Sequence, residues 1–459
     1  MTGAAGIRSA PAGRRYWGRR EKQRDERLCF FFFKNEVRPL CGRVYPRVSH
    51  HGHAAVSQGI VPCAVRNESF GYISHDYLYY CVKFQDAIHV AVCDTPAGQY
   101  EFYGRVRYKD GTVMAEHQPY DPSVICTEEG NFLYFGFAPC MISIPRYKNQ
   151  NLRGGSVLQL EEDMLTVKKG PKVILPSLNY GKGTSFEGNE YFEGPSIRKI
   201  NSRYYLIYSS VNTHQLCYAV SDQPMSGFRF GGVIVSNGDV GYQGRTEEEK
   251  LMSVGNNHGG LVQVKDQWYI FYHRHTALDQ YNRQGCAERI YFQEDGSIPQ
   301  VTITTSGMNP IPLSGNASYP AVYCCNLTNG HMGALSSLGR SNAEADFPYM
   351  TCENQERYIK NIKDGTLIGY KYINLRETRR IEVIYKTDKE GILEIHTQMM
   401  PHTCRCGPGG KKHAEIQLEP SQYWKSAETE IGFEDEKELY LIYKGSGKLS
   451  LLELRLKKA

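Results

Sequence analysis

The sequence predicts an all-β protein, a β-propeller followed by a β-sandwich. Three observations lead to this prediction. One phrase, a strand, a turn and an aromatic strand, occurs three times; the chain contains 45 Gly and 33 Tyr but no helical heptads; and a break rich in Pro, Gly, Ser and Asn precedes a change of pattern. At 459 residues the chain is long enough for two or three domains.

The repeated phrase covers residues 120–137 (YDPSVICTEEGNFLYFGF), 193–210 (EGPSIRKINSRYYLIYSS) and 258–275 (HGGLVQVKDQWYIFYHRH). A second echo pairs AVCDTPAGQYEFYG at 91–104 with AVSDQPMSGFRFGG at 219–232. These two segments lie 128 residues apart (219 minus 91), or two periods of about 64. A period of that length holds four short strands with turns, which is the signature of a propeller blade.

Three polar residues occupy nearly the same register of the phrase. Asp121 and His258 align with Gly194, and Glu193 stands one residue earlier; the spacings are 73 (194 minus 121) and 64 (258 minus 194). Because the innermost strand of each blade lines a central channel, we expect the three side chains to converge. The alternative is that each residue only caps the end of a strand.

The domain boundaries follow from changes in pattern. The blade rhythm begins at HDYLYYCV (75–82) and runs to about residue 312, where NPIPLSGNASYPA (309–321) interrupts it. Beyond the break, short alternating strands such as RRIEVIYK and KELYLIYKG indicate a β-sandwich. We therefore expect an irregular basic segment or degenerate first blade at 1–65, the propeller at 66–314 and the sandwich at 321–459.

The net charge of +5 is unevenly distributed. Residues 1–50 hold 12 Lys and Arg and 4 Asp and Glu, a surplus of 8, so the remainder carries −3 (5 minus 8). Such a basic arm could contact nucleic acid. Because no nucleic-acid motif follows it, a disordered or mistranslated leader is the preferred interpretation.

Cysteine usage and apolar runs predict a reduced, cytoplasmic protein without a membrane or nucleic-acid partner. The 14 Cys are scattered, no apolar run approaches 18 residues, and LCFFFF (28–33) is too short for a signal-peptide core. Cys404 and Cys406 form a lone C-x-C near His402 and His413. A Gly-rich loop is preferred there over a metal site.

Residues 75–312 resemble glycoside hydrolase family 43. The resemblance rests on SFEGNEYFEGPSIRK, NNHGGLVQ, WYIFYHRH and DPSV. It implies a five-bladed propeller that removes arabinofuranosyl or xylosyl residues from plant oligosaccharides or polysaccharides with inversion. It also implies an Asp base in the first blade, a modulating Asp in the third and a Glu acid in the fourth. A related family that acts on fructans matches FEGPSIRK less well.

Carried over residue by residue, the resemblance makes Glu193 the general acid and Asp121 the residue that raises the pKa of that acid. It implies substrate binding by His258, whose position can lie near calcium or water, and by Arg283, for which a salt-bridged turn residue is the alternative. Apart from that calcium, no metal or cofactor is expected. The H-x-H at 273–275 is interpreted as a packing and hydrogen-bonding pair.

The first-blade base is the departure from the family pattern. Before residue 76 the only Asp is Asp25, inside EKQRDERL, and Glu36 would stand where the family has its Asp. Residues 1–65 are therefore interpreted as a damaged, truncated or frame-shifted first blade. The alternative function is a catalytically impaired carbohydrate-binding protein that lacks the general base.

The C-terminal region, from about 321 to 459, resembles a family 6 carbohydrate-binding module through GYKYINL and ELYLIYKGSGKLSLLELRL. The resemblance implies aromatic side chains that stack on sugar faces. Four residues are candidates, with core packing as the alternative for each: Tyr370, Tyr372, Tyr423 and Trp424.

Overall fold

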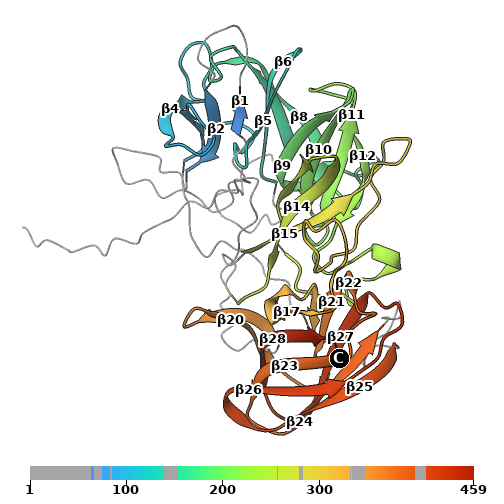
Figure 1. Cartoon of the computed structure of the whole chain (residues 1–459). Helices are drawn as coiled ribbons and strands as arrows, with labels where there is room; N and C mark the ends of the chain where they lie inside the picture. Colours follow the sequence, from blue (N-terminus) through green and yellow to red (C-terminus); the bar gives the residue numbers. More distant parts are fainter. Residues whose placement is uncertain are drawn as a thin grey trace, which may run out of the picture.

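The computed structural model describes residues 64–66, 75–82, 85–138, 153–255, 257–278, 283–330, 332, 347–397 and 410–458. Within these ranges the regular structure consists of strands and three short 3-10 helices, η2 (Leu178–Tyr180), η3 (Tyr242–Gly244) and η4 (Ala321–Tyr323). None of the described helices is long and apolar enough to cross a membrane. The predicted all-β class is confirmed, with one lobe that contains β1 to β15 and a second lobe built from later strands (Figure 1).

The first lobe contains four antiparallel sheets, and in each the strands pair in sequence order. The first sheet is β1 (Ala64–Arg66), β2 (Asp76–Cys81), β3 (Ile88–Cys93) and β4 (Glu101–Arg105); the second is β5 (Ser123–Thr127), β6 (Gly130–Phe135), β7 (Gly154–Leu160) and β8 (Val167–Pro176). The third is β9 (Tyr191–Ile200), β10 (Arg203–Ser210), β11 (Leu216–Ser221) and β12 (Arg229–Val235), and the fourth is β13 (Gly259–Val264), β14 (Gln267–His275) and β15 (Arg283–Ile290).

The strand pairing confirms the sequence repeat. Successive sheets use equivalent partners at offsets of 73 and then 64 residues, in the pairs Ser123↔Tyr134, Ser196↔Ile207 and Gly260↔Phe271. The second echo holds as well, because Ala91 pairs with Phe102 and Ala219 with Phe230, each beside a register shift at the same place. These sheets are the second to fifth blades of the predicted propeller. Of residues 1–65, expected to form an irregular segment or a degenerate first blade, only 64 and 65 are described, and they belong to β1 of the first sheet.

Apolar cores join neighbouring blades. Because successive strand residues point to opposite faces, each middle strand supplies one core on either side. The cores between the first and second, second and third, and third and fourth sheets include Val90 with Leu133, Tyr134 with Leu206, and Ile207 with Ile270. The first strands of adjacent blades also touch, since the Ile197 N–H of β9 donates to Ser123 Oγ of β5 at 3.1 Å.

The second lobe is the predicted β-sandwich. Its first sheet contains β17 (Ala317–Pro320), β19 (Tyr349–Glu353), β20 (Glu356–Ile362), β28 (Leu449–Lys457), β23 (Arg380–Thr387) and β26 (Ser421–Glu430). Its second sheet contains β18 (Asn326–Thr328), β21 (Leu367–Lys371), β27 (Glu438–Lys444), β24 (Gly391–Thr397) and β25 (Lys411–Leu418). A short parallel pair, β16 (Leu313–Ser314) with β22 (Ile373–Asn374), follows the propeller.

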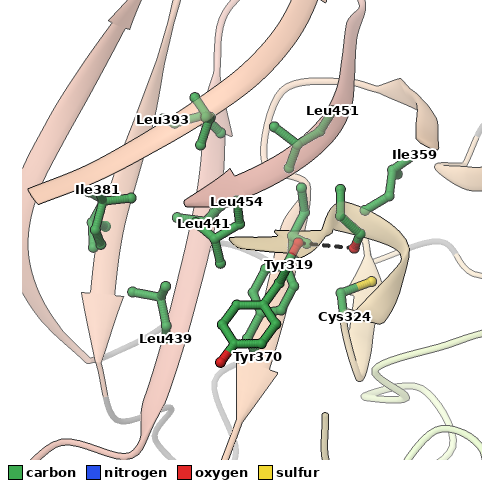
Figure 2. Packing of buried hydrophobic residues seen from close by; sticks show 14 of the residues in the cluster. Tyr319, Cys324, Ile359, Tyr370, Ile381, Leu393, Leu439, Leu441, Leu451 and Leu454 are labelled. Carbon is green, nitrogen blue, oxygen red and sulfur yellow. Dashed lines mark hydrogen bonds between the residues drawn. The ribbon is translucent and has the colours of Figure 1, made fainter. Parts of the chain in front are cut away.

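The sandwich is held together by side chains from both sheets. Figure 2 shows Leu393, Leu439, Leu441, Leu451 and Leu454 gathered between them, and all five are fully buried. Burial of that much aliphatic surface is the main stabilising contribution to such a domain.

Truncation of Leu454 to Ala tests this core. Because the side chain is fully buried in the central strand β28, we expect a loss of about 2–5 kcal/mol in the free energy of unfolding. The matched control is Tyr423→Ala, at a residue that is 82% exposed, which should change stability by less than about 0.5 kcal/mol. Calorimetry or urea unfolding measures both, and equal losses would contradict the assignment.

Candidate active site

Three blades deliver one polar side chain each to a common point. Asp121 lies two residues before β5, Glu193 is the third residue of β9, and His258 directly precedes β13. His258 Nε2 lies 3.0 Å from Glu193 Oε1 and 3.8 Å from Asp121 Oδ2, and the three side chains are only 3 to 14% exposed. The convergence predicted from the repeat is therefore present in the structure.

The backbone around this cluster adopts conformations that bring the groups together. Gly194 has φ +67°, and a Cβ added there would lie 3.0 Å from the His258 ring, so a glycine lets the imidazole rest against the strand. Asp121 itself has φ +50°, an uncommon conformation for a residue other than glycine. A non-glycine residue held in this region costs about 1–3 kcal/mol, and such residues concentrate at functional sites.

The proton affinities of the two carboxylates differ in the order opposite to the sequence prediction. Burial raises the pKa of Asp121 from its ordinary 3.8 to about 7; His258 and Arg283 oppose burial, and Glu193 reinforces it. For Glu193, burial would raise the pKa, but attraction to His258, His214 and Arg283 outweighs burial and lowers it. The reason is geometric, because the imidazole is closer to Glu193 than to Asp121.

His258 is the basic group of the cluster. Burial alone would lower its pKa, but the two carboxylates raise it. Its backbone N–H donates to His273 Nε2 at 3.2 Å, and Arg283 Nη1 lies 3.4 Å from that same His273 nitrogen. The interpretation of His273 as a hydrogen-bonding residue is confirmed. Arg283 begins β15, in a strand rather than a turn, and acts electrostatically on both carboxylates.

His214 is a residue near the site that sequence reasoning missed. It lies in the turn between β10 and β11, at the end of the blade that carries Glu193, because Ser209 pairs with Glu193. Its ring lies edge-on to Phe192, with the centroids 4.6 Å apart, and its Nδ1 is 3.3 Å from Ser209 Oγ. Burial lowers the pKa of His214. It lies in a turn beyond the repeated phrase, so no periodicity pointed to it.

The three clustered groups carry donor atoms that metal ions bind. Their donor atoms, two carboxylate oxygens and one imidazole nitrogen, lie within 4.8 Å of one another. Calcium takes six to eight oxygen ligands, so these three described groups alone do not fit it. Calcium near His258 stays a prediction, and the C-x-C at 404–406 lies outside the described residues.

The aromatic candidates of the sandwich separate into core and surface. Tyr370 is fully buried and donates its OH to the Ala321 carbonyl, so of its two interpretations core packing is the right one and sugar stacking is not. Tyr372 is half-buried, and its carbonyl accepts the Leu313 N–H. Tyr423 is 82% exposed. Trp424 donates its Nε1–H to Glu356, and Lys386 Nζ lies 4.1 Å from the centre of its ring.

The propeller blades and their carboxylate cluster define a glycoside hydrolase. The model of glycosyl hydrolases family 43 matches residues 73–298. A xylosidase/arabinosidase of Thermoclostridium stercorarium is 40% identical over 386 residues, 82% of this chain and 78% of that protein. The chain belongs to glycosyl hydrolases family 43 and is a glycosidase.

Two solved structures are similar to this chain. One is the crystal structure of a glycoside hydrolase family 43 arabinoxylan arabinofuranohydrolase from Bacillus subtilis in complex with cellotetraose. The match covers 87% of this chain and 79% of that chain, with 17% sequence identity and a TM-score of 0.40. The other is the structure of CsCBM6-3 from Clostridium stercorarium in complex with cellobiose. The match covers 33% of this chain and 99% of that chain, with 12% sequence identity and a TM-score of 0.25.

Gly194→Ala should damage catalysis more than folding. The added Cβ would meet the His258 ring at 3.0 Å in a left-handed backbone position, so the imidazole must move. A displacement near 1 Å in such a site costs roughly 10²-fold in kcat. Gly365→Ala is the control, because Gly365 has φ +75° with nothing within 4 Å. Turnover equal in the two variants would contradict the positioning by Gly194.

The raised pKa of Asp121 has a consequence for stability. The folded chain keeps this proton up to about pH 7, whereas the unfolded chain releases it near 3.8, so the contribution of Asp121 to stability falls as pH rises between these values. Asp121→Asn should remove this part of the pH dependence of the free energy of unfolding. Urea unfolding from pH 4 to pH 8 measures it, and parallel curves for the two proteins would refute the buried, protonated carboxyl.

Proposed function

We propose that this chain hydrolyses terminal arabinofuranosyl or xylosyl linkages with inversion, with Glu193 as general acid and Asp121 as its modulator. The observation that carries the proposal is the spacing of the carboxylates. The acid and base of an inverting glycosidase stand about 6.5–9.5 Å apart, so that a water fits between them. Donor atoms of Asp121 and Glu193 lie within 4.8 Å, which suits an acid and a neighbour that tunes it.

The glycosidic oxygen is a poor leaving group unless it receives a proton during bond cleavage. In the substrate-free cluster His258 Nε2 lies 3.0 Å from Glu193 Oε1 and 3.8 Å from Asp121 Oδ2. The imidazolium gives its proton to Glu193 and takes up the proton that Asp121 releases, so Glu193 becomes the neutral acid, Asp121 becomes ionised and His258 stays charged. An ionised Asp121 beside it favours this protonated form, because two neighbouring like charges repel. Bound sugar excludes water and strengthens the effect.

The general base is the third part of the proposal. Glu36, the predicted candidate, lies outside the described residues. The proposal requires a carboxylate that faces Glu193 across the bound sugar and activates water there. Full activity of a Glu36→Gln variant would remove that candidate.

The substrate class is supported by the related xylosidase/arabinosidase of Thermoclostridium stercorarium. The family acts on glycosidic bonds, so a carbohydrate substrate follows from membership. Pentose specificity is the finer part of the proposal. The exposed Tyr423 of the sandwich offers an aromatic ring on which a sugar of a longer polysaccharide can stack.

Glu193→Gln tests the acid. We expect turnover of unsubstituted arabino- and xylo-oligosaccharides to fall by about 10²–10⁴-fold, and that of p-nitrophenyl α-L-arabinofuranoside or β-D-xyloside to fall much less, since p-nitrophenol leaves without protonation. Glu187→Gln is the matched control, because Glu187 is an exposed carboxylate whose Oε2 accepts the Gly183 N–H.

Two outcomes would contradict the proposal. Glu193→Gln turnover that falls equally on both substrate types, or not at all, would remove Glu193 as the acid. Proton NMR of the first-formed sugar gives the stereochemistry, and a retained anomeric configuration would instead make Asp121 and Glu193 a nucleophile and acid pair.

A further inference from the structure

The two domains meet through a buried ion pair. Lys371, the last residue of β21 in the sandwich, places Nζ 2.9 Å from Asp239 Oδ2, in the propeller loop after β12. The side chains are 8% and 1% exposed. Burial alone would lower the pKa of Lys371, but Asp239 raises it to about 12, so the amine stays charged. Figure 1 shows β21 and β22 at the end of the sandwich nearest the propeller.

Asp239 fixes its loop from several sides. Its Oδ1 accepts the Ile303 N–H at 2.9 Å, and its Oδ2 accepts the Thr302 hydroxyl at 3.2 Å and Asn326 Nδ2–H at 3.4 Å. Asp239 has φ +54°, so the loop depends on these contacts to hold an uncommon backbone conformation. Asn326 belongs to β18, so the sandwich supplies a second donor besides Lys371.

The same loop reaches the catalytic cluster. Asn237, two residues before Asp239, accepts a hydrogen bond at Oδ1 from Asn257 Nδ2 at 3.3 Å. Asn257 directly precedes His258, and both asparagines are at least 97% buried. Asn237 and Asn257 therefore connect the loop that carries Asp239 to the backbone of His258.

A second connection runs through the neighbouring strand. Arg274 follows His273, which accepts the His258 N–H. The Arg274 guanidinium is buried and donates to the Cys325 carbonyl at 2.8 Å and the Cys324 carbonyl at 3.0 Å, in the segment that enters the sandwich.

We infer that the β-sandwich is a positioning element of the active site: Lys371, through Asp239, Asn237 and Asn257, holds His258 at its distance from Glu193. Lys371 and Asn237 are positioning residues and touch no substrate. The inference rests on the proposed role of Glu193 as acid. It assigns the second domain a task in the reaction, besides any binding of polysaccharide.

The test compares leaving groups in Lys371→Met and Asn237→Ala. A displaced His258 impairs protonation by Glu193, so kcat on an unsubstituted oligosaccharide should fall at least tenfold more than kcat on the p-nitrophenyl glycoside, with KM changed less than threefold. A purely structural defect lowers the active fraction and reduces both rates equally. Lys371→Arg keeps the charge and should recover most of the selective loss.

Lys457→Met is the matched control. Lys457 bridges Glu382 and Glu428 within the sandwich, away from the ion pair with the propeller, and should leave the ratio of the two rates unchanged. Asn237→Ala leaves the Lys371–Asp239 contact in place, so it reports on the connection even if Lys371→Met does not fold.

Equal losses on both substrates, or a wild-type ratio in Asn237→Ala, would overturn the inference. The result for Glu193→Gln separates the two proposals. If Glu193→Gln shows no selectivity between leaving groups, the proposed acid has failed; if it does and Asn237→Ala does not, only the positioning role has failed.

Discussion

The shared register of successive blades is the constraint on which the site depends. A shift of one residue in any hairpin would turn every side chain of that strand to the opposite face. The pairs Ser123↔Tyr134 and Ser196↔Ile207 repeat at one offset, and Ser123 bonds directly to the next blade at Ile197. The apolar cores on both faces of each middle strand enforce that register. Residues that are far apart in sequence therefore meet to within a few ångströms.

Convergence creates an electrostatic problem that the same residues solve. Two carboxylates buried within 4.8 Å repel and lose hydration, and each alone would be protonated. His258 stabilises the charge of one carboxylate. Because its Nε2 is closer to Glu193 than to Asp121, Glu193 is the one that stays ionised. That approach requires Gly194, since any side chain there would contact the ring. Which of the two carboxylates holds the proton in the resting site thus depends on Gly194. Before bond cleavage, the bound substrate must shift that proton from Asp121 to Glu193.

The features that could be predicted from the sequence are those that recur with the repeat. The repeat located Asp121, Glu193 and His258 and the strands that carry them, because their neighbours recur at a fixed spacing. It could not reveal the pKa order, which depends on a difference of 0.8 Å (3.8 minus 3.0) between two contacts. His214 lies in a turn, where no periodicity acts. Whether Tyr370 packs in the core or stacks on sugar stayed open, because alternation does not tell a core tyrosine from an exposed one. Lys371 meets Asp239 across 132 residues without any local pattern.

Burial of Lys371 and Asp239 bears on why the two domains form one chain. A flexible tether suffices to bring a binding module near a substrate, and surface contacts would then be enough. A desolvated ion pair is different, because loss of either partner leaves an uncompensated buried charge and costs about 3–5 kcal/mol. Such a contact fixes orientation more than it adds stability. Since its propeller half lies two residues from Asn237, and Asn237 bonds to the residue before His258, the orientation of the sandwich and the geometry of the acid are set together.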